Sequence, residues 1–520
     1  MSYLSPHHTS NYSTENVTGK SRSVTSIYHP DKIEDIQALV TQARATGISL
    51  YPYSTGFNWG YGSHSPIKEG CALVDLSNMN RILNADTISR DHPVAIIEPG
   101  VTQIQLYKFL RKHAPELKFN VTGSGKETSI IGNSLDRGVG YLGPRKNDLF
   151  GLEIVTGTGE ILHTGFRRLG ASSPLASTHP FGLGPILDGL FFQSNFGIVT
   201  SACLKLYPKH PVEIAVSLNL YKNNDLPGFI QELIRLRQEG ILTSVTHIGN
   251  HTRARATLTY GITQYLENEC SLSREIALEE ANKALKVIIA EGWTGLAGVA
   301  GTAEQVKAAV KEIRGRMQKF GKIRVVTDKL LTSSYKITHA LRHFPGVRTY
   351  AAAICAMRPL HGLTLGTPTD IAVENLLWKF NHSTTQATEL DKSRCGLLFI
   401  NPALPPNGMT ISKIIEDLET IAKTYDHILY LTINIETETS VVAIINLLFD
   451  RSIPEETRCA HNCANALLEY LHNKKLEVYR ARADMMGQIT TTNPDYWKKI
   501  FALKQIFDPD NIIAHQRYNL

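Results

Sequence analysis

The sequence predicts an α+β protein with two lobes. The chain has 520 residues, which is more than one ordinary domain holds. Its first 211 residues combine short β-branched strands with glycine-rich turns. From Val212 onward, longer amphipathic helices alternate with strands. The second part therefore predicts a separate α+β lobe in which helices cover a sheet.

Composition and charge narrow the possible functions. Hydrophobic residues make up 42% of the chain and charged residues 20%, as in a globular protein. The formal net charge is +6, and the basic pairs Arg167–Arg168, Lys474–Lys475 and Lys498–Lys499 are isolated. A nucleic-acid partner therefore has little support, whereas a slightly positive surface suits small anionic ligands.

The seven cysteines are scattered, which argues against a disulfide framework and for a reducing compartment. Cys459, His461 and Cys463 are close in sequence, but on a helix His461 points away from the cysteines and no second pair completes four ligands, so no metal site is predicted. The amino terminus lacks the apolar segment of a signal peptide, and no apolar run is long enough to span a bilayer. We expect a cytoplasmic protein without a membrane partner.

The first lobe opens on a β-α-β unit. Ser23–Tyr28 predicts a strand, and apolar residues at helical spacing predict a helix over Ile33–Ala45 that Gly47 ends. Ile48–Tyr53 predicts a second strand, which runs into the turn Ser54–Gly62 (STGFNWGYG). A glycine-rich turn at the end of a strand can present backbone N–H groups to a pyrophosphate.

The remaining elements of the first lobe follow in order. They are strands at Ala72–Leu76 and Val94–Glu98, a helix capped by Thr102 that runs to about His113, a hairpin of Leu152–Val155 and Glu160–His163, and a strand that ends near Leu206. Pro208 and Pro211 then mark a boundary.

Five glycines lie in Gly123–Tyr141 (GSGKETSIIGNSLDRGVGY), with Lys126, Asp136 and Arg137 between them. Glycine lets a backbone approach a ligand closely, so this loop is predicted to surround a large planar or phosphorylated ligand. A turn-rich surface loop is the alternative. Its end, Gly138–Gly143, satisfies G-x-G-x-x-G, but no helix follows, which argues against a dinucleotide-binding fold.

The second lobe is predicted from longer elements. The expected strands are Val212–Tyr221, Thr243–Ile248, Ala256–Tyr260 and Leu476–Arg480, and the expected helices are Leu226–Gln238, Leu272–Glu291, Ala303–Phe320 and Glu456–His472. Helices and strands also alternate over Ile411–Leu448, and a last helix precedes Phe507.

Four motifs of the first lobe share their order and spacing with a known family. They are STGFNWGYG (54–62), EPGV (98–101), GNSLDRGVGY (132–141) and DGLFFQSNFGIVT (188–200). Weaker similarities lie at Gly366–Asp370, Trp378, the proline-containing stretch Asn401–Gly408 and Tyr479–Arg480. Each motif is weak alone. Together they resemble the FAD-linked oxidases of the vanillyl-alcohol oxidase / p-cresol methylhydroxylase family, and within it the 4-phenol-oxidising branch, over nearly the whole chain.

The resemblance implies an FAD-binding domain made from both chain ends, residues 1–211 and 477–520, and a cap, residues 212–476, with an antiparallel sheet covered by helices. Clustered N–H donors suit a pyrophosphate, and backbones without side chains suit a flat ring system. The residues that the resemblance places beside FAD are Ser54, Thr55, Gly56, Phe57, Asn58, Gly100, Gly123, Ser124, Gly125, Gly132, Asn133, Gly138, Asn195, Gly197, Ile198, Val199 and Arg517.

In the 4-phenol-oxidising branch, two tyrosines and an arginine bind the phenolate oxygen, and the matching positions are Tyr61, Tyr479 and Arg480. A phenol ionises near pH ~10, so ionisation near neutrality needs roughly 4 kcal/mol of preference for the anion. A buried arginine and two hydroxyl donors can supply that preference. The resemblance then implies hydride transfer from the carbon at the para position to the flavin, and Tyr141 as a further pocket wall. A strand-end pair with a solvated charge is the alternative for Tyr479 and Arg480.

Several positions depart from the family pattern. Ser124 stands where oxidase members carry an active-site carboxylate, and Val441–Ala443 stands where histidine-linked members attach their flavin. No tyrosine equivalent is evident, and His64 is a minor candidate for attachment, so FAD is expected to be bound without a covalent bond. Phe57, Leu142–Arg145 and His515–Gln516 also differ, which indicates a relative with its own substrate.

The sequence thus predicts an FAD-dependent oxidase or dehydrogenase acting on a small aromatic substrate, in the first place a para-substituted phenol. Two alternatives stay open: the same fold acting on a non-phenolic alcohol, amine or heterocycle, and a flavin-free binding module. Oxygen or another electron carrier would reoxidise the flavin. The family usually forms homodimers, although no feature of the sequence establishes one here.

Overall fold

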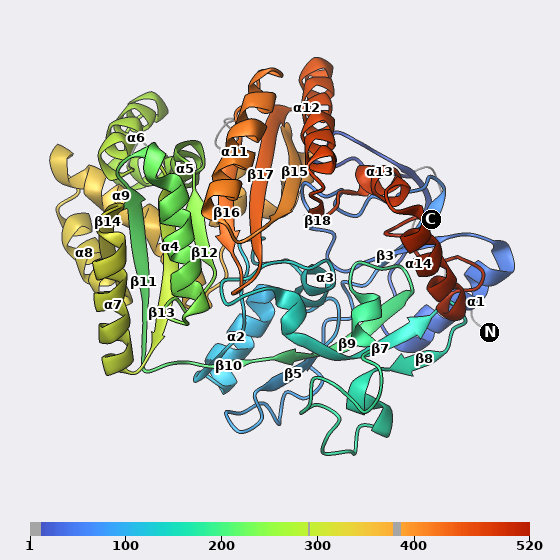
Figure 1. The fold of residues 1–520 in the computed structure, drawn as a ribbon. Coiled ribbons are helices and arrows are strands. Elements are labelled where there is room, and N and C mark those ends of the chain that lie inside the picture. Colours follow the sequence, from blue (N-terminus) through green and yellow to red (C-terminus); the bar gives the residue numbers. More distant parts are fainter. Residues whose placement is uncertain (1–11, 290–291, 378–385) are drawn as a thin grey trace.

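The computed structural model describes residues 12–289, 292–377 and 386–520, and in it a cap lobe lies over a first lobe built from both chain ends (Figure 1). Trp378 and the last residues of the helix expected to reach Glu291 lie outside the described residues. The α+β class expected from the sequence is confirmed.

The β-α-β unit of the first lobe is present. β2 (Ser23–Tyr28), β4 (Cys71–Asp75) and β3 (Leu50–Tyr53) run parallel, and β1 (Tyr12–Ser13) pairs antiparallel with β2 at the edge. α1 (Ile33–Thr46) connects β2 to β3 and ends at Gly47, whose φ of 71° is in the left-handed region. The apolar face of α1 packs on this sheet. This packing fixes the end of β3 and the turn that follows it, residues 54–58.

A second sheet of the first lobe is antiparallel. Its strand order is β5 (Val94–Ile97), β9 (Gly197–Lys205), β7 (Leu149–Thr156) and β8 (Ile161–His163), and β7 and β8 form the expected hairpin. α2 (Gln103–His113) starts where predicted, because the Thr102 side chain accepts a hydrogen bond from the Gln105 N–H. β6 (Leu117–Lys118) and β10 (Tyr207–Pro208) form a small additional pair.

The cap is built on an eight-stranded sheet in which every pair is antiparallel. Its strand order is β14 (Gly321–Val326), β11 (Val212–Leu220), β13 (Thr294–Gly301), β12 (Thr246–Gly249), β16 (Tyr430–Ile435), β17 (Val441–Asp450), β15 (Cys395–Leu404) and β18 (Val478–Arg480). β18 belongs to the segment after residue 476, so the C-terminal part of the chain contributes one strand to the cap. The division of the chain at residues 212 and 477 stays a prediction.

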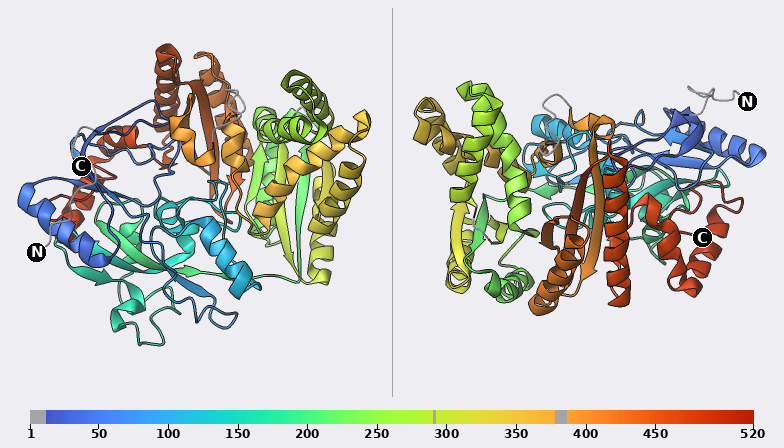
Figure 2. Two further views of the ribbon diagram at one scale, coloured as in Figure 1. Left: turned by 180° about the vertical axis from the view of Figure 1, so that it is seen from behind. Right: turned by 90° about the horizontal axis from the view of Figure 1, so that it is seen from above.

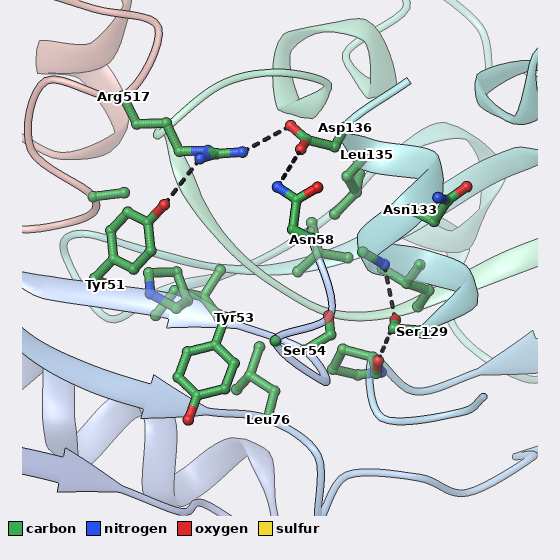
Figure 3. A pocket seen from close by; sticks show the side chains of 18 of the residues that line it. Tyr51, Tyr53, Ser54, Asn58, Leu76, Ser129, Asn133, Leu135, Asp136 and Arg517 are labelled. Carbon is green, nitrogen blue, oxygen red and sulfur yellow. Dashed lines mark hydrogen bonds and ion pairs between the residues drawn. The ribbon is translucent and has the colours of Figure 1, made fainter. Parts of the chain in front are cut away.

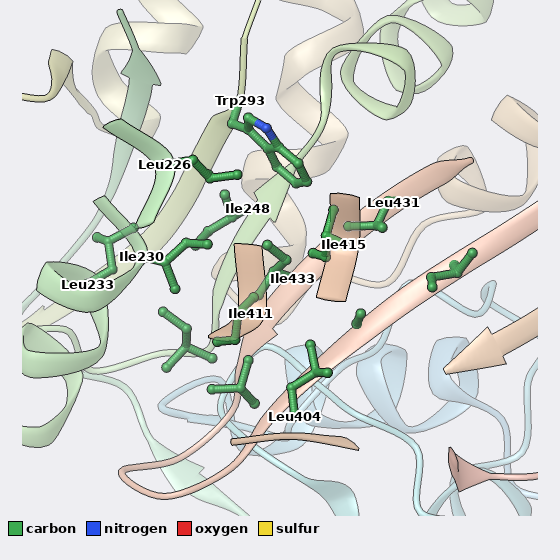
Figure 4. Close-up of a cluster of buried hydrophobic side chains, with 14 of the residues drawn as sticks. Leu226, Ile230, Leu233, Ile248, Trp293, Leu404, Ile411, Ile415, Leu431 and Ile433 are labelled. Atoms are coloured by element: carbon green, nitrogen blue, oxygen red, sulfur yellow. The ribbon is translucent and has the colours of Figure 1, made fainter. Parts of the chain in front are cut away.

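One face of the cap sheet is covered by helices. These are α4 (Leu226–Gln238), α7 (Ala303–Met317), α11 (Gly408–Lys423) and α12 (Pro454–Asn473). Their apolar side chains and those of the strands form one core, in which Ile230, Ile415 and Ile433 lie close together (Figure 4). Burial of this many aliphatic side chains is the main source of cap stability.

One expected strand of the cap is wrong, since Ala256–Tyr260 lies inside α5 (His251–Cys270). The Asn250 side chain caps this helix by accepting from the Arg253 N–H at 2.9 Å. Ile262 and Leu266 then pack one turn apart in a cluster with the neighbouring helices. This packing outweighs the β preference of the local threonines. The neighbours are α6 (Arg274–Ile288), α8 (Asp328–Ala340), α9 (Pro345–Thr364) and α10 (Ile371–Leu377).

The other face of the cap sheet is partly apolar, where Leu397, Tyr430 and Leu448 pack together, and partly polar where it turns toward the first lobe. Side chains alternate across a strand, so the core positions Ile433 and Ile435 place Asn434 and Glu436 on the opposite face. The pairing of His247 with Asn434 puts His247 on that face too. Asn401 lies there as well, because it hydrogen-bonds to Tyr61 of the first lobe.

The C-terminal segment returns to the first lobe. α13 (Met486–Thr491) and α14 (Pro494–Phe507) lie at the same end of the molecule as α1 (Figures 1 and 2). The stretch after α14 contacts α1 and β3, because Asp510 forms an ion pair with Arg44 at 2.7 Å and Ile513 bridges to Leu50. The Leu50 N–H donates to Ile512, and the Ala514 N–H donates back to Leu50. This places Arg517 beside the turn that follows β3.

The sequence predicts neither a metal site nor a membrane-spanning helix, and both expectations can be compared with the described residues. Within residues 12–289, 292–377 and 386–520, no cluster of three histidine, cysteine, aspartate or glutamate side chains could hold a metal ion. No helix of these same residues has the length and apolar character needed to cross a membrane. All seven cysteines are free, and His461 hydrogen-bonds to the Thr18 carbonyl rather than lying with Cys459 and Cys463.

Candidate functional site

A cavity lies in the first lobe where segments far apart in sequence meet (Figure 3). It is lined by residues 51–58 at the end of β3 and in the turn that follows, by residues 128–136 around α3 (Ile130–Leu135), by residues from Phe191 to Val199 ahead of and within β9, and by the C-terminal segment. The glycine-rich loops that the sequence singled out therefore converge on one site.

Close backbone approach explains two glycines of this cavity. A Cβ on Gly132 would lie 2.9 Å from the Ser54 Oγ, and a Cβ on Gly197 would lie 2.4 Å from the Ile154 Cγ2. Ser129 fixes the turn before Gly132, because its hydroxyl accepts from the Gly132 N–H at 2.9 Å and donates to the Pro99 carbonyl at 2.6 Å. Part of the cavity wall, the turn before Gly132, is thus backbone that the Ser129 hydroxyl holds in place.

Replacing Ser129 by alanine is expected to lower the free energy of unfolding by about 1–2 kcal/mol, because a helix cap and a buried hydrogen bond are lost together. It is also expected to weaken FAD binding. Urea unfolding and a dissociation constant for FAD measure the two effects. Ser273→Ala, which removes the exposed cap of α6, is the control and should lose stability without losing FAD affinity. Equal FAD affinity in the two variants would contradict the expectation.

Most of the residues expected beside FAD line this cavity. These are Ser54, Thr55, Gly56, Phe57, Asn58, Gly132, Asn133, Asn195, Gly197, Ile198, Val199 and Arg517. Their contact with the cofactor stays a prediction. Asn133 lines the cavity with part of its amide, while its buried Oδ1 packs against the backbone of Gly138.

The other expected cofactor residues, Gly100, Gly123, Ser124, Gly125 and Gly138, do not line the cavity. A Cβ on Gly100 would meet the Ser77 carbonyl at 2.3 Å, and one on Gly138 would meet the Asn133 Oδ1 at 2.0 Å, so both glycines permit close packing.

The loop of Gly123, Ser124 and Gly125 faces the cap. A Cβ on Gly123 would lie 3.3 Å from the Ala372 Cβ of α10. The neighbouring Lys126 forms an ion pair with Asp370 at 2.9 Å, which ties this loop to the cap.

The position of the missing carboxylate is occupied by a neutral group. The Ser124 hydroxyl lies 2.6 Å from the Thr122 hydroxyl, with which it shares a hydrogen bond. Val441 and Ala443 point into the cap core, so of that trio Val442 alone faces the first lobe. His64 is half-buried beside Tyr53 and does not line the cavity. Non-covalent FAD therefore stays a prediction.

Asp136 pairs with two arginines at the wall of the cavity, and Figure 3 shows its contact with one of them, Arg517. Its carboxylate lies 2.8 Å from the Arg480 Nη2 and 2.7 Å from the Arg517 Nη2. Burial alone would raise the pKa of Asp136, but the two guanidinium groups outweigh burial and lower this pKa to about 2. Two cations share one anion, so the group keeps a net charge of +1 beside the cavity.

Asn58 completes the support of Arg480. The Asn58 Nδ2 donates to Asp136 at 3.0 Å, while the Arg480 Nη2 donates to the Asn58 Oδ1. Burial opposes the charged form of Arg480, but Asp136 and the nearby tyrosine hydroxyls raise its pKa above the ordinary value. Arg480 is therefore a permanent cation in a fixed orientation.

Arg480 lies against a pair of tyrosines. Its guanidinium carbon is 4.0 Å from the centre of the Tyr61 ring. The Asn401 amide donates to the Tyr61 oxygen, and Tyr479 is a second hydrogen-bond partner of Tyr61. Burial raises the pKa of both tyrosines, so both hydroxyls keep their protons. The structure thus brings together all three expected catalytic residues.

Two residues of this cluster were missed as site residues. In the sequence, Asp136 is one charged residue in a glycine-rich loop. Asn401 is one residue of the proline-containing stretch Asn401–Gly408, which is only weakly similar to the family. A carboxylate inside a loop expected to wrap an anionic ligand could have signalled a role in pairing arginines. For Asn401 the sequence offers no such signal.

A polar strip continues from this cluster along the cap sheet. Glu436 lies near Tyr479, its Oε1 is buried without a hydrogen-bond partner in the described residues, and burial raises its pKa to about 7. Asn434, two residues earlier, accepts from the His247 Nδ1 at 2.8 Å. Tyr141, the expected pocket wall, lies against His247 with ring centres 4.7 Å apart.

Comparison with known proteins places this site in context. A family model described as an FAD binding domain matches residues 25–165. 1'-carboxy-chondrochloren decarboxylase from Chondromyces crocatus is 28% identical, over 95% of this chain and 90% of that protein. The 4-cresol dehydrogenase (hydroxylating) flavoprotein subunit from Pseudomonas putida is 24% identical, over 93% of this chain and 86% of that protein.

Two solved structures show the same fold. p-Cresol methylhydroxylase with substrate bound matches with a TM-score of 0.78 and 24% identity, covering 96% of this chain and 89% of that one. 4-Ethylphenol oxidase from Gulosibacter chungangensis, in complex with isoeugenol, matches with a TM-score of 0.80 and 24% identity, covering 97% of this chain and 91% of that one.

The fold and the matched domain define a flavoprotein. The cavity suits FAD, since glycines bring its backbone close to the space inside and two arginines sharing one carboxylate leave a net positive charge beside it. The resemblance to the vanillyl-alcohol oxidase / p-cresol methylhydroxylase family is confirmed, and the chain is an FAD-dependent oxidase or dehydrogenase. The alternative of a flavin-free binding module is thereby set aside.

Proposed function

We propose that this enzyme removes a hydride from a para-substituted phenol held as its phenolate by Tyr61, Tyr479 and Arg480. The supporting observation is the position of Arg480, which lines the FAD cavity while its guanidinium lies over the Tyr61 ring. A ligand bound at this cluster lies beside the cofactor cavity, as hydride transfer requires.

The cluster favours the anionic form of a phenol. Because Asn401 and Tyr479 both donate to the Tyr61 oxygen, the proton of Tyr61 is not used by either bond and can be donated to a ligand oxygen. The net charge of +1 on the group of Arg480, Arg517 and Asp136 further stabilises the phenolate by electrostatic attraction. A shift of the phenol pKa from ~10 to near 7 needs roughly 4 kcal/mol, which the Arg480 cation and the Tyr61 hydroxyl, itself polarised by Tyr479, can provide.

The phenolate drives the reaction at the para position. When FAD is bound in the cavity, it supplies the acceptor for a hydride. The residues of this chain hold the phenolate oxygen, stabilise its charge and fix the ring, so that its electrons move toward the carbon that loses the hydride. The oxidised substrate is a para-quinone methide, which takes up water to give a 4-hydroxybenzylic alcohol. Oxygen or an electron carrier would complete the cycle.

A second outcome of the same oxidation is suggested by one relative, which is named a decarboxylase. If the substrate carries a carboxylate on the carbon next to the oxidised one, the bond to that carboxylate breaks and CO2 leaves. The electron pair of this bond forms the new C=C bond and restores the phenolate. Arg253 lies near His247 at the far end of the polar strip and has no ion-pair partner among the described residues, so it suits a substrate carboxylate and favours this outcome.

A phenol and its methyl ether separate this proposal from oxidation of a non-phenolic group. Under anaerobic conditions, 4-ethylphenol is expected to bleach the absorbance of the oxidised flavin, and 4-ethylanisole is expected to leave it unchanged, because the ether cannot ionise. Equal bleaching by both compounds would show that ionisation of the substrate has no role and would contradict the proposal.

A further inference from the structure

Arg253, in the first turn of α5, carries a charge that nothing in the described chain neutralises. Its guanidinium forms no hydrogen bond or ion pair within residues 12–289, 292–377 and 386–520, although it has five N–H donors and cannot lose its proton. Burial lowers the pKa of Arg253, and the Tyr141 hydroxyl is the group that acts in the opposite direction. A half-buried cation of this kind is unfavourable unless an anion compensates it.

The position of Arg253 follows from the strand beside it. A Cβ on Gly249 would lie 3.7 Å from the Arg253 Cγ, so the stem of Arg253 covers the space where a side chain of Gly249 would project. Gly249 and His247 are two residues apart on β12, and they therefore share the face of the sheet that turns toward the first lobe. Arg253 thus lies over the polar strip beside His247.

His247 and Tyr141 add two further polar groups with unused capacity. The His247 Nδ1 is committed to Asn434, while its Nε2 is buried and has no partner in the described part of the chain. Burial, helped by the nearby Arg253, lowers the pKa of His247 to about 4, although the hydrogen bond to Asn434 acts in the opposite direction. The hydroxyl of Tyr141 keeps its proton, since burial raises the pKa of Tyr141 to about 12. A guanidinium, a hydroxyl donor and an imidazole therefore meet without an internal anion.

This group is connected to the phenol cluster through the sheet. His247 is paired with Asn434 on the neighbouring strand, and Glu436 follows two residues later on the same face. Neighbouring strands are about 4.8 Å apart and two residues advance about 6.6 Å, so His247 lies roughly 8 Å from Glu436. Glu436 is close to Tyr479. One extended ligand can therefore reach both ends of the strip.

We propose that Arg253, Tyr141 and His247 form a subsite for a carboxylate carried on the side chain of the substrate. The substrate class is then a 4-hydroxyphenyl alkanoate, with the phenolate at Tyr61, Tyr479 and Arg480 and the carboxylate at Arg253. The proposal rests on the proposed function for the orientation of the ligand. A single planar guanidinium matches a carboxylate in charge and in its paired N–H donors, whereas a phosphate dianion would call for more than one cation.

The test compares each 4-hydroxyphenyl alkanoate with two to five side-chain carbons with the 4-alkylphenol of the same length, using the full-length enzyme loaded with FAD. The ratio of kcat/KM between carboxylated and neutral substrate is expected to exceed ten for at least one length. In Arg253→Met the best ratio is expected to fall at least tenfold, since a hydrogen-bonded charge is lost. Arg255→Met is the matched control, because Arg255 lies on the same helix and hydrogen-bonds to Asn282, and it should keep the ratio.

Failure of the subsite and failure of the phenol proposal give different results. If neutral phenols bleach the flavin and no carboxylated phenol is preferred, or if Arg253→Met keeps the preference, the subsite is overturned while the proposed function stands. If no phenol bleaches the flavin, the subsite is tested by ligand binding alone. 4-Methoxyphenyl alkanoates should then still raise the Tm of the native enzyme and leave the Tm of Arg253→Met unchanged. Equal shifts in the two proteins would overturn the subsite.

Stability gives a readout that does not depend on activity. Without ligand, Arg253→Met is expected to have a higher Tm than the native enzyme, because it removes a cation without a counter-ion from a partly buried site. A lower Tm combined with an unchanged substrate ratio would assign the guanidinium a purely structural role and would contradict the proposal.

Discussion

Replacing Asp136 by asparagine is expected to lower the free energy of unfolding by about 3–5 kcal/mol, because the change leaves two buried arginines without their shared counter-ion. It should also weaken FAD binding, since Arg517 and Asn58 line the cavity and are held by this carboxylate. Urea unfolding and a dissociation constant for FAD measure the two effects.

The matched control is Asp495→Asn, which removes an exposed partner of Lys498. A surface pair of this kind contributes little, so the control should change the free energy of unfolding by less than about 1 kcal/mol. Similar losses in both variants would show that Asp136 is not an essential counter-ion.

The same carboxylate predicts a pH dependence of stability. The pKa of Asp136 is lowered to about 2 in the folded protein, against 3.8 as its ordinary value. Its stabilising contribution is therefore complete above about pH 4 and is lost as the pH falls toward 2, with a size of about 2 kcal/mol. The difference in unfolding free energy between the native enzyme and Asp136→Asn should shrink over this interval. A difference that stays constant from pH 6 to pH 2 would contradict this assignment.

Tyr61→Phe is expected to lower kcat/KM for 4-ethylphenol about 100-fold. The substitution removes the hydroxyl that can donate to the phenolate, and hydrogen bonds to charged groups contribute about 1.5–3 kcal/mol. The ring, its stacking on Phe399 at 4.8 Å and its contact with Arg480 are retained. The rate should fall without loss of the bound flavin, which stopped-flow absorbance can follow.

Tyr470→Phe is the control for this substitution. Tyr470 lies on α12 and hydrogen-bonds to Asp417, away from the cavity, so its loss should leave kcat/KM within about twofold of the native value. If Tyr61→Phe stayed within the same range, the tyrosine would have no part in activating the phenol.

The sequence predicts the first lobe well because its signals are local. The strand Ser23–Tyr28, the helix that Gly47 ends and the cap Thr102 depend on residues within one or two turns of each other, and each lies where expected. The glycine-rich loops were informative for another reason, since glycine is needed wherever the backbone comes close to other groups. A Cβ at Gly132 would collide with the Ser54 Oγ, and one at Gly197 with the Ile154 Cγ2.

The missed features depend on contacts between distant parts of the chain. Asp136 meets Arg480 and Arg517 across more than 300 residues of sequence, so no local pattern reveals the shared carboxylate. Arg253 and His247 become neighbours only through the register of the cap sheet. The same kind of tertiary packing overrides the β preference of Ala256–Tyr260 and makes that segment helical.

The central claim is that the cluster of Tyr61, Tyr479 and Arg480 holds its ligand as a phenolate. The most direct test uses 4-chlorophenol, which has no carbon at the para position to oxidise. Its ultraviolet difference spectrum on binding to the FAD-loaded enzyme at pH 7 reports the ionisation state of the bound phenol. We expect the phenolate band at this pH, about three units below the ordinary pKa of a phenol. A bound phenol that stays neutral up to pH 9 would contradict the account.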